Sequence, residues 1–227
     1  MIPVRDEIKT QRIPYVNYAL IAINIIVFMT MVFNPHKIDS IVMQNALIPA
    51  EVTQNFSLSV IKNFFTAMFL HAGWLHLISN MLYLWIFGDN IEDRLGHLGY
   101  LLFYLGSGVF ASILHVVFNA NSVVPSLGAS GAIAGVLGAY LVFYPNSRVY
   151  TFIPFGFFMR LRPLPAILVL GLWFVTQIFS GLGSLASTAQ GGVAYRAHIG
   201  GFVFGLALGY VLKGRVKEPV PAPPHWN

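Results

Sequence analysis

Residues 125–135 read PSLGASGAIAG, and this stretch decides how the chain is organised. Ser130 stands between Gly128 and Gly131 at the start of an apolar run. We predict a helix over residues 130–144, about 22 Å long at roughly 1.5 Å per residue. The hydrocarbon core of a bilayer is about 30 Å thick, so this helix is short for a span. We therefore expect the Ser130 hydroxyl to lie roughly 8 Å below one membrane surface.

The composition places the protein in a membrane. Of its 227 residues, 56% are hydrophobic and only 9% are charged, whereas soluble domains carry about 25% charged residues. Several apolar runs reach the length of roughly 20 residues that a spanning helix needs. We therefore expect an all-α, polytopic membrane protein. The sequence contains no cysteine, which excludes disulfides, a thiol nucleophile and cysteine metal sites. Its polar start does not resemble a cleaved signal peptide.

The apolar runs predict six transmembrane helices in one membrane domain over residues 15–212. The expected spans are residues 15–33, 63–87, 99–118, 130–144, 164–180 and 197–212. An N-terminal segment over residues 1–14 precedes this domain, and a proline-rich tail over residues 213–227 follows it. Between the spans we expect short interfacial helices, a charged turn and a loop containing arginines, over residues 34–62, 89–97 and 145–163.

The distribution of positive charge predicts which side of the membrane each loop occupies. Ten of the 13 Lys and Arg residues fall on the side of the two termini, and three, Lys37, Lys62 and Arg196, fall on the other. Because Lys and Arg accumulate in cytoplasmic loops, we expect both termini in the cytoplasm. The net charge of +5 is explained by this sorting, so we expect no nucleic-acid partner.

Polar side chains recur at matched depth in three of the expected spans. Ser130 begins the fourth span and His198 the sixth, and both starts lie on the outer side. Serine and imidazole at matched depth on parallel helices are candidates for a nucleophile and its base. On the second span, His76 and Asn80 share one helix face, because they are four residues apart. His71, five residues before His76, faces elsewhere.

An oxyanion would find hydrogen-bond donors at this depth. The side chains of His76 and Asn80 both carry N–H groups. The first turn of the fourth span adds free backbone N–H groups and the positive end of the helix dipole. Such donors are often the largest single contribution to acyl-transfer catalysis. These residues are therefore candidates for stabilising an oxyanion beside Ser130.

Small residues favour close contact between the fourth and sixth spans. Glycines recur at three- or four-residue spacing in both: Gly131, Gly135 and Gly138 in the fourth span, and Gly201, Gly205 and Gly209 in the sixth. Small residues at such spacing let membrane helices approach closely. The first turns of the two helices would then bring Ser130 and His198 within reach of each other.

Each candidate also has a structural explanation. Ser130 can serve as a helix cap or a packing residue, and His198 can bind a neighbouring backbone carbonyl. A pair such as His76 and Asn80 can simply join two helices. A zinc site fits poorly, because no His-x-x-x-His pair and no acidic partner lies at this depth. We therefore expect no metal and no other cofactor.

The motifs together resemble the rhomboid family of intramembrane serine proteases. The matching segments are GASG at residues 128–131, AHIGGFVFG at residues 197–205, His71 with HLISN at residues 76–80, and EDRLG at residues 92–96. Their order also matches the family, and the likeness extends over about residues 15–212. The resemblance implies a six-helix core with a Ser–His dyad that lacks an aspartate.

The family's roles are carried over onto the matching residues. Ser130 would be the nucleophile, and His198 the general base and then the general acid. His76, Asn80 and the Ser130 backbone N–H would form the oxyanion hole, with His71, Gly128 and Gly131 supporting the site. The substrates would be single-pass membrane proteins, cut at or near the outer end of their spanning helix after small residues. The membrane would be a bacterial-type inner (plasma) membrane, with the site open to its outer side.

The chain departs from the family pattern beside the candidate histidine and in the first loop, which lacks the Trp-Arg pair that many members carry. Well-studied members carry an aromatic residue four positions after the serine, and it stacks on the catalytic histidine; this chain has Ala134 there. The orientation of the imidazole must therefore come from elsewhere, and Trp74 and Tyr195 are the candidates nearest in sequence.

Two other functions compete with a protease. A non-catalytic rhomboid-like protein would bind membrane clients, but that class usually lacks the serine or the histidine, and both are present here. A small channel or transporter would predict charged or repeated pore-lining segments. The expected spans contain no Lys, Arg, Asp or Glu and no duplicated half.

Overall fold

A computed structural model describes residues 1–55, 57–156, 158–186 and 195–214, with the backbone alone for residues 181–186. The long helices are α1 (Tyr15–Val32), α5 (Trp74–Leu95), α6 (His97–Phe118), α7 (Ser130–Phe143), α8 (Ala166–Ala186) and α9 (Tyr195–Lys213). The short ones are η1 (Pro35–Lys37), α2 (Ile38–Asn45), α3 (Pro49–Gln54), α4 (Leu58–Thr66) and η2 (Ala67–Phe69). Three strands complete the described elements, namely β1 (Ile2–Asp6), β2 (Arg148–Phe155) and β3 (Phe158–Pro165). The chain is predominantly helical, as predicted, but the sheet was not predicted.

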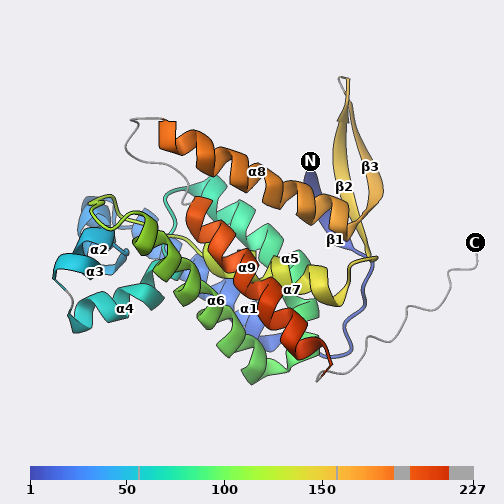
Figure 1. Cartoon of the computed structure of the whole chain (residues 1–227), viewed down its shortest axis with the longest axis horizontal. Coiled ribbons are helices and arrows are strands. Elements are labelled where there is room, and N and C mark those ends of the chain that lie inside the picture. Colours follow the sequence, from blue (N-terminus) through green and yellow to red (C-terminus); the bar gives the residue numbers. More distant parts are fainter. Residues whose placement is uncertain (56, 157, 187–194, 215–227) are drawn as a thin grey trace, which may run out of the picture.

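The fourth long helix, α7, forms the centre of the bundle, among α5, α6 and α9 (Figure 1). Each of its residues from Gly131 to Tyr140 is buried. Only Ala, Gly and other apolar residues precede Tyr140 in this segment, so neighbouring helices can approach the α7 backbone closely. A helix buried all round fixes the position of Ser130 at its first turn.

The lengths and composition of the helices agree with a polytopic membrane protein. Within the described part of the chain, α1, α6 and α9 are long and apolar enough to cross a bilayer. The apolar segments Ser130–Phe143 and Ala166–Ser180 are shorter. With 14 residues, α7 spans about 21 Å, less than a bilayer core. The count of six spans stays a prediction.

The second predicted span is wrong at both ends. The chain does not run as one helix from Asn63: α4 and η2 end by Phe69, and α5 begins only at Trp74, after Gly73 with extended backbone. Nor is there a turn over residues 89–97, because α5 continues to Leu95 and the chain turns at Gly96, whose φ is 72°. The region predicted to hold short helices, residues 34–62, does contain η1, α2, α3 and the start of α4.

Charged residues remain helical at the end of α5 because their partners come from other elements. Glu92 is 1% exposed, and its two carboxylate oxygens accept hydrogen bonds from the backbone N–H groups of Val16 and Asn17, at 2.9 and 2.7 Å. These are among the N–H groups that the first turn of α1 leaves free. The Nδ1 atom of His97, at the start of α6, lies 2.5 Å from the same carboxylate. Glu92 thus joins the ends of α1, α5 and α6.

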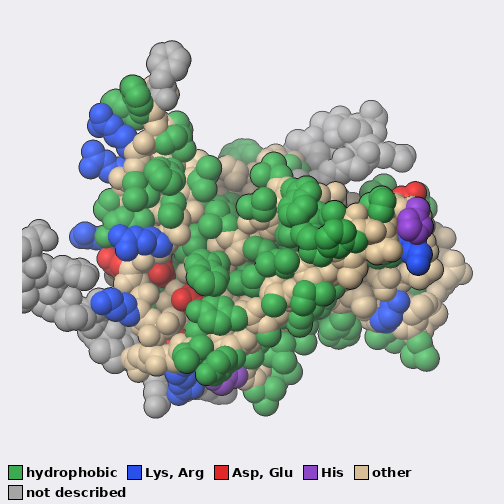
Figure 2. All heavy atoms as spheres, turned by 180° about the vertical axis from the view of Figure 1, so that it is seen from behind, with side chains coloured by type: hydrophobic (Ala, Val, Ile, Leu, Met, Phe, Trp, Pro, Cys, Tyr) green, Lys and Arg blue, Asp and Glu red, His purple; other side chains and the backbone are tan. Residues whose placement is uncertain are grey.

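The segments predicted as a polar lead-in and an arginine loop form an antiparallel sheet in the order β1-β2-β3. It lies at the end of the bundle where α7 finishes, opposite Ser130 (Figure 1). Its base is anchored: the Asp6 carboxylate accepts hydrogen bonds from Tyr140 on α7, at 2.5 Å, and from Asn90 on α5, at 2.9 Å. Lys and Arg side chains gather mainly at this end of the molecule (Figure 2).

Parts of two sequence predictions fall outside the described residues. These are the loop after the fifth span, over residues 187–194, and the proline-rich tail from residue 215 onward.

Candidate active site

The side chains of Ser130 and His198 meet at one end of the bundle. Ser130 is the first residue of α7, and His198 lies in the first turn of α9. Ser130 Oγ lies 2.7 Å from His198 Nε2, within hydrogen-bond distance. His198 is 7% exposed, so this contact lies at the edge of the packed interior. A hydroxyl hydrogen-bonded to an imidazole has the arrangement of an activated nucleophile and its base.

Glycines bring α7 and α9 close enough for that contact. A Cβ atom at Gly201 would collide with the Gly131 carbonyl oxygen, and one at Gly205 with the Gly135 carbonyl oxygen. A Cβ at Gly138 would likewise collide with the Phe202 carbonyl oxygen. The two backbones therefore touch along three turns, and any larger residue would push them apart.

The His198 imidazole has a hydrogen-bond partner that the sequence analysis missed. Gln177 on α8 places its Oε1 atom 2.8 Å from His198 Nδ1. Its amide nitrogen donates a hydrogen bond to Thr176 Oγ1 at 3.3 Å. A polar side chain in an otherwise apolar spanning run is unusual and often functional, and that signal could have identified Gln177.

Aromatic rings also contact His198, but not all of those proposed. The Trp173 ring on α8 lies 5.9 Å from the imidazole, and Tyr195 meets it edge-on at 6.4 Å. Trp74 instead packs edge-on against Phe28 at 5.0 Å, so it was the wrong candidate. The position of the missing aromatic, Ala134, is fully buried beside Gly201, where the close approach of α9 requires a small side chain.

His76 and Gly128 lie beside Ser130. Gly128 has a φ of 126°, and a Cβ atom there would stand 2.8 Å from His76 Nε2 and 3.7 Å from Ser130 Oγ. Glycine is therefore required at position 128 for two reasons: its backbone conformation disfavours other residues, and the His76 imidazole leaves no room for a side chain. The His76 Nδ1 atom accepts a long hydrogen bond of 3.4 Å from the Ala72 N–H. This bond favours the tautomer with its hydrogen on Nε2, which faces the region of Gly128 and Ser130.

Asn80 and His71 complete the surroundings of His76. The Asn80 amide donates one hydrogen bond to the His76 carbonyl oxygen at 2.8 Å, so its second N–H hydrogen can bind a further acceptor. His71 is 1% exposed and packs edge-on against His76, with ring centroids 5.0 Å apart. The expectation that His71 faces away from His76 is therefore wrong.

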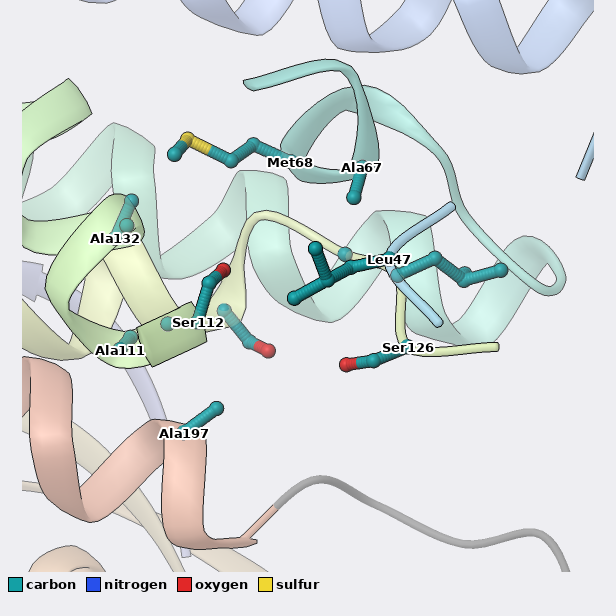
Figure 3. A pocket seen from close by; sticks show the side chains of 13 residues that line it. Leu47, Ala67, Met68, Ala111, Ser112, Ser126, Ala132 and Ala197 are labelled. Carbon is teal, nitrogen blue, oxygen red and sulfur yellow. The ribbon is translucent and has the colours of Figure 1, made fainter. Parts of the chain in front are cut away.

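A small cavity of about 30 Å³ adjoins Ser130. Met68 and Ala67 of η2, Ala132 of α7 and Ala197 of α9 contribute to its wall (Figure 3). The hydroxyl groups of Ser112 and Ser126 also line it (Figure 3). A cavity of this size holds one or two water molecules.

No group of three or more His, Asp or Glu side chains in the described residues is arranged to hold a metal ion.

Comparison with known proteins gives the family. The model of the rhomboid domain matches residues 58–215, which is most of the chain. The chain belongs to the rhomboid family. It is 37% identical over 148 residues to RHOMBOID-like protein 6, mitochondrial, of Arabidopsis thaliana, a match that covers 65% of this chain and 42% of the relative.

Two further rhomboid relatives are similar over the same extent. Identity to rhomboid protein 1, mitochondrial, of Saccharomyces cerevisiae is 31% over 156 residues, or 66% of this chain and 41% of the relative. Identity to presenilin-associated rhomboid-like protein A, mitochondrial, of Danio rerio is 30% over 161 residues. This match covers 67% of this chain and 38% of the relative. The rhomboid domain described here thus spans about two fifths of the length of these relatives.

Proposed function

We propose that this rhomboid is an intramembrane serine endopeptidase that uses Ser130 and His198 as a catalytic dyad. The observation that carries the proposal is the 2.7 Å contact between Ser130 Oγ and His198 Nε2, made across two helices interlocked by glycines. A serine that merely capped α7 would not need an imidazole on another helix. Membership of the rhomboid family supports the same assignment.

In the first half of the reaction, Ser130 Oγ attacks the carbonyl carbon of the scissile peptide bond while its proton passes to His198 Nε2. The negative charge on the carbonyl oxygen is stabilised by the His76 Nε2–H, the free Asn80 N–H and the Ser130 backbone N–H. The C–N bond then breaks, and His198 gives the proton to the leaving amine. The products are a free amino terminus and an ester on Ser130.

In the second half, water hydrolyses the ester. His198 takes a proton from the water molecule, whose oxygen attacks the ester carbonyl carbon, and returns a proton to Ser130 Oγ as the acid leaves. Unwound substrate backbone and water are tolerated inside a membrane only where protein groups satisfy them. The small cavity lined by Ser112 and Ser126 offers such a place beside Ser130.

We propose single-pass membrane proteins as substrates, cut near the outer end of their spanning helix. The depth of Ser130 at the start of a short helix supports this position. The small cavity of about 30 Å³ beside Ser130 supports a preference for a small side chain before the cut. The excess of Lys and Arg at the sheet end supports an orientation with both termini in the cytoplasm and the dyad near the outer face. We propose a bacterial-type plasma membrane as the location.

The test is cleavage of a fluorescent transmembrane substrate in liposomes by the wild type, Ser130→Ala and His198→Ala. Loss of a serine nucleophile or its base costs on the order of 10⁴ to 10⁶ in rate in other enzymes. Both variants should be inactive while keeping the thermal stability of the wild type. A wild type that cleaves no faster than Ser130→Ala, and that no fluorophosphonate labels at Ser130, would favour a non-catalytic client-binding protein instead.

A further inference from the structure

The amide of Gln177 connects a third helix to the dyad. His198 comes from α9 and Ser130 from α7, whereas Gln177 lies on α8, 21 residues before His198. The chain of contacts runs from Gln177 Oε1 to His198 Nδ1 at 2.8 Å, and from His198 Nε2 to Ser130 Oγ at 2.7 Å. Both ring nitrogens of the imidazole are therefore engaged, one on each side.

The chemistry of an amide oxygen decides where the imidazole hydrogen lies. An amide oxygen only accepts hydrogen bonds, so His198 Nδ1 must carry the hydrogen and donate it to Gln177 Oε1. In a neutral imidazole the other nitrogen is then an acceptor, so Nε2 is free to take the Ser130 hydroxyl proton. The bond from the Gln177 amide nitrogen to Thr176 Oγ1 favours this orientation of the amide, with its oxygen toward His198.

No carboxylate competes for this role among the described residues. The titratable groups that act on His198 are the imidazoles of His76 on α5 and His115 on α6, and the Tyr195 ring contacts it from α9 itself. The Trp173 ring on α8 packs against one side of the imidazole but has no acceptor for the Nδ1 hydrogen. Gln177 is thus the group whose chemistry selects the tautomer.

We propose that Gln177 is a positioning residue of the dyad: it holds His198 in the tautomer that accepts the Ser130 proton. The assignment rests on the proposed protease function and extends it from two helices to three. It predicts that the nucleophilicity of Ser130 depends on a side chain of α8 that never touches the substrate carbonyl.

The first test is the rate at which a fluorophosphonate labels Ser130 in detergent, together with kcat and KM on the transmembrane substrate. A hydrogen bond of this kind contributes about a tenfold effect, so Gln177→Leu should lower the labelling rate and kcat about tenfold and leave KM unchanged. Gln177→Glu keeps the acceptor and should restore most of the rate. Gln44→Leu on α2, the same change far from the dyad, should match the wild type.

The second test is the pH profile of kcat/KM for Gln177→Glu. A carboxylate beside Nδ1 favours the protonated imidazole, which cannot accept the Ser130 proton. The acidic limb of the profile should therefore move to higher pH than in the wild type. A role in packing alone would change the height of the profile but not the position of that limb.

A third measurement needs no catalysis. It uses NMR spectra of the protein labelled with ¹⁵N-histidine. The signals that disappear in His198→Ala are assigned to His198. They should show a hydrogen on Nδ1 in the wild type and a mixture of tautomers in Gln177→Leu.

The outcomes separate the two proposals. If the wild type is labelled and active, Ser130→Ala is inactive, and Gln177→Leu equals the wild type in rate and tautomer, the positioning role is wrong and the protease stands. If the wild type is neither labelled nor active, the protease fails, whatever tautomer His198 shows.

Discussion

Two clusters of polar groups, one around Glu92 and one around the dyad, differ in how many of their hydrogen bonds are formed. At the sheet end, where α7 meets β1 and β2, the Glu92 carboxylate accepts two backbone N–H bonds and contacts His97. At the dyad end, formed by Ser130, His198, His76 and Asn80, donors stay available. The Asn80 amide uses one of its two hydrogens to bind the His76 carbonyl oxygen, and the other is available to a ligand.

This difference shows how one helix serves two purposes. Buried polar groups with all their hydrogen bonds formed stabilise a fold, whereas groups left with open positions mark a place for something else to bind. The α7 helix begins at the dyad end and finishes at the sheet end, where the Tyr140 hydroxyl donates to Asp6. Substitutions at the sheet end should therefore change stability, and those at the dyad end should change activity.

The largest expected effect is on stability, at Glu92. Removing its carboxylate in Glu92→Ala leaves the first turn of α1 without acceptors in a buried place, which should cost about 4 kcal/mol of unfolding free energy. Thermal unfolding in detergent checks this, and the fraction that stays folded should retain wild-type activity per molecule. Glu51→Ala in α3 is the control. An unchanged midpoint in Glu92→Ala would contradict the role of the sheet end.

Next comes His76→Ala at the dyad end. Loss of one oxyanion donor should lower kcat by about 10²-fold, roughly 3 kcal/mol in the activation barrier. The midpoint of thermal unfolding should change little, because the His76 ring makes few bonds within the fold. His36→Ala in η1 serves as the matched control. A variant that loses stability but keeps its kcat would show that His76 is structural.

Gly205→Ala tests the contact that joins the two ends. The added methyl group would collide with the Gly135 carbonyl oxygen and separate α9 from α7. We expect a loss of about 2 kcal/mol in stability, together with a lower kcat because His198 moves away from Ser130. Gly171→Ala on α8 meets no atom within 4 Å and should be neutral. If both alanine variants behave alike, the glycine contact does not control the geometry of the dyad.

The smallest effect concerns pH and Asp6. Burial raises the pKa of the Asp6 carboxyl from 3.8 to about 6, although the hydrogen bond from Tyr140 acts in the opposite direction. The folded protein therefore binds this proton more tightly, and the stability gained below pH 3.8 is lost as the pH rises through about 6. From pH 8 to pH 5, the wild type should gain about 1 kcal/mol relative to Asp6→Asn. Parallel unfolding curves of the two proteins over this range would contradict it.

Part of this architecture could be predicted from local sequence. Apolar runs predicted the long helices, except for the bounds of the second span, and α7 begins at Ser130, as its surrounding glycines indicated. The spacing of Gly201 and Gly205 predicted that α9 approaches α7 closely. These features depend on composition and on helical periodicity over a few turns, which the sequence contains in full.

Other features depend on pairings between distant segments. β1 pairs with β2 across more than 140 residues of chain, and neither segment shows a clear alternating pattern that would reveal a strand by itself. The charged end of α5 was predicted as a turn, but it is helical, and the partner of Glu92 is the start of α1, 75 residues away.

What the sequence alone determined is the class of the protein, its membrane helices and the two residues of the candidate dyad. What only the tertiary structure decided is which groups complete that dyad. Ala134 lies where α9 crosses α7 and a small side chain is needed, and α8 brings the Gln177 amide to His198 Nδ1. Periodicity specifies which face of a helix is buried, but only packing specifies which side chain of a third helix arrives there.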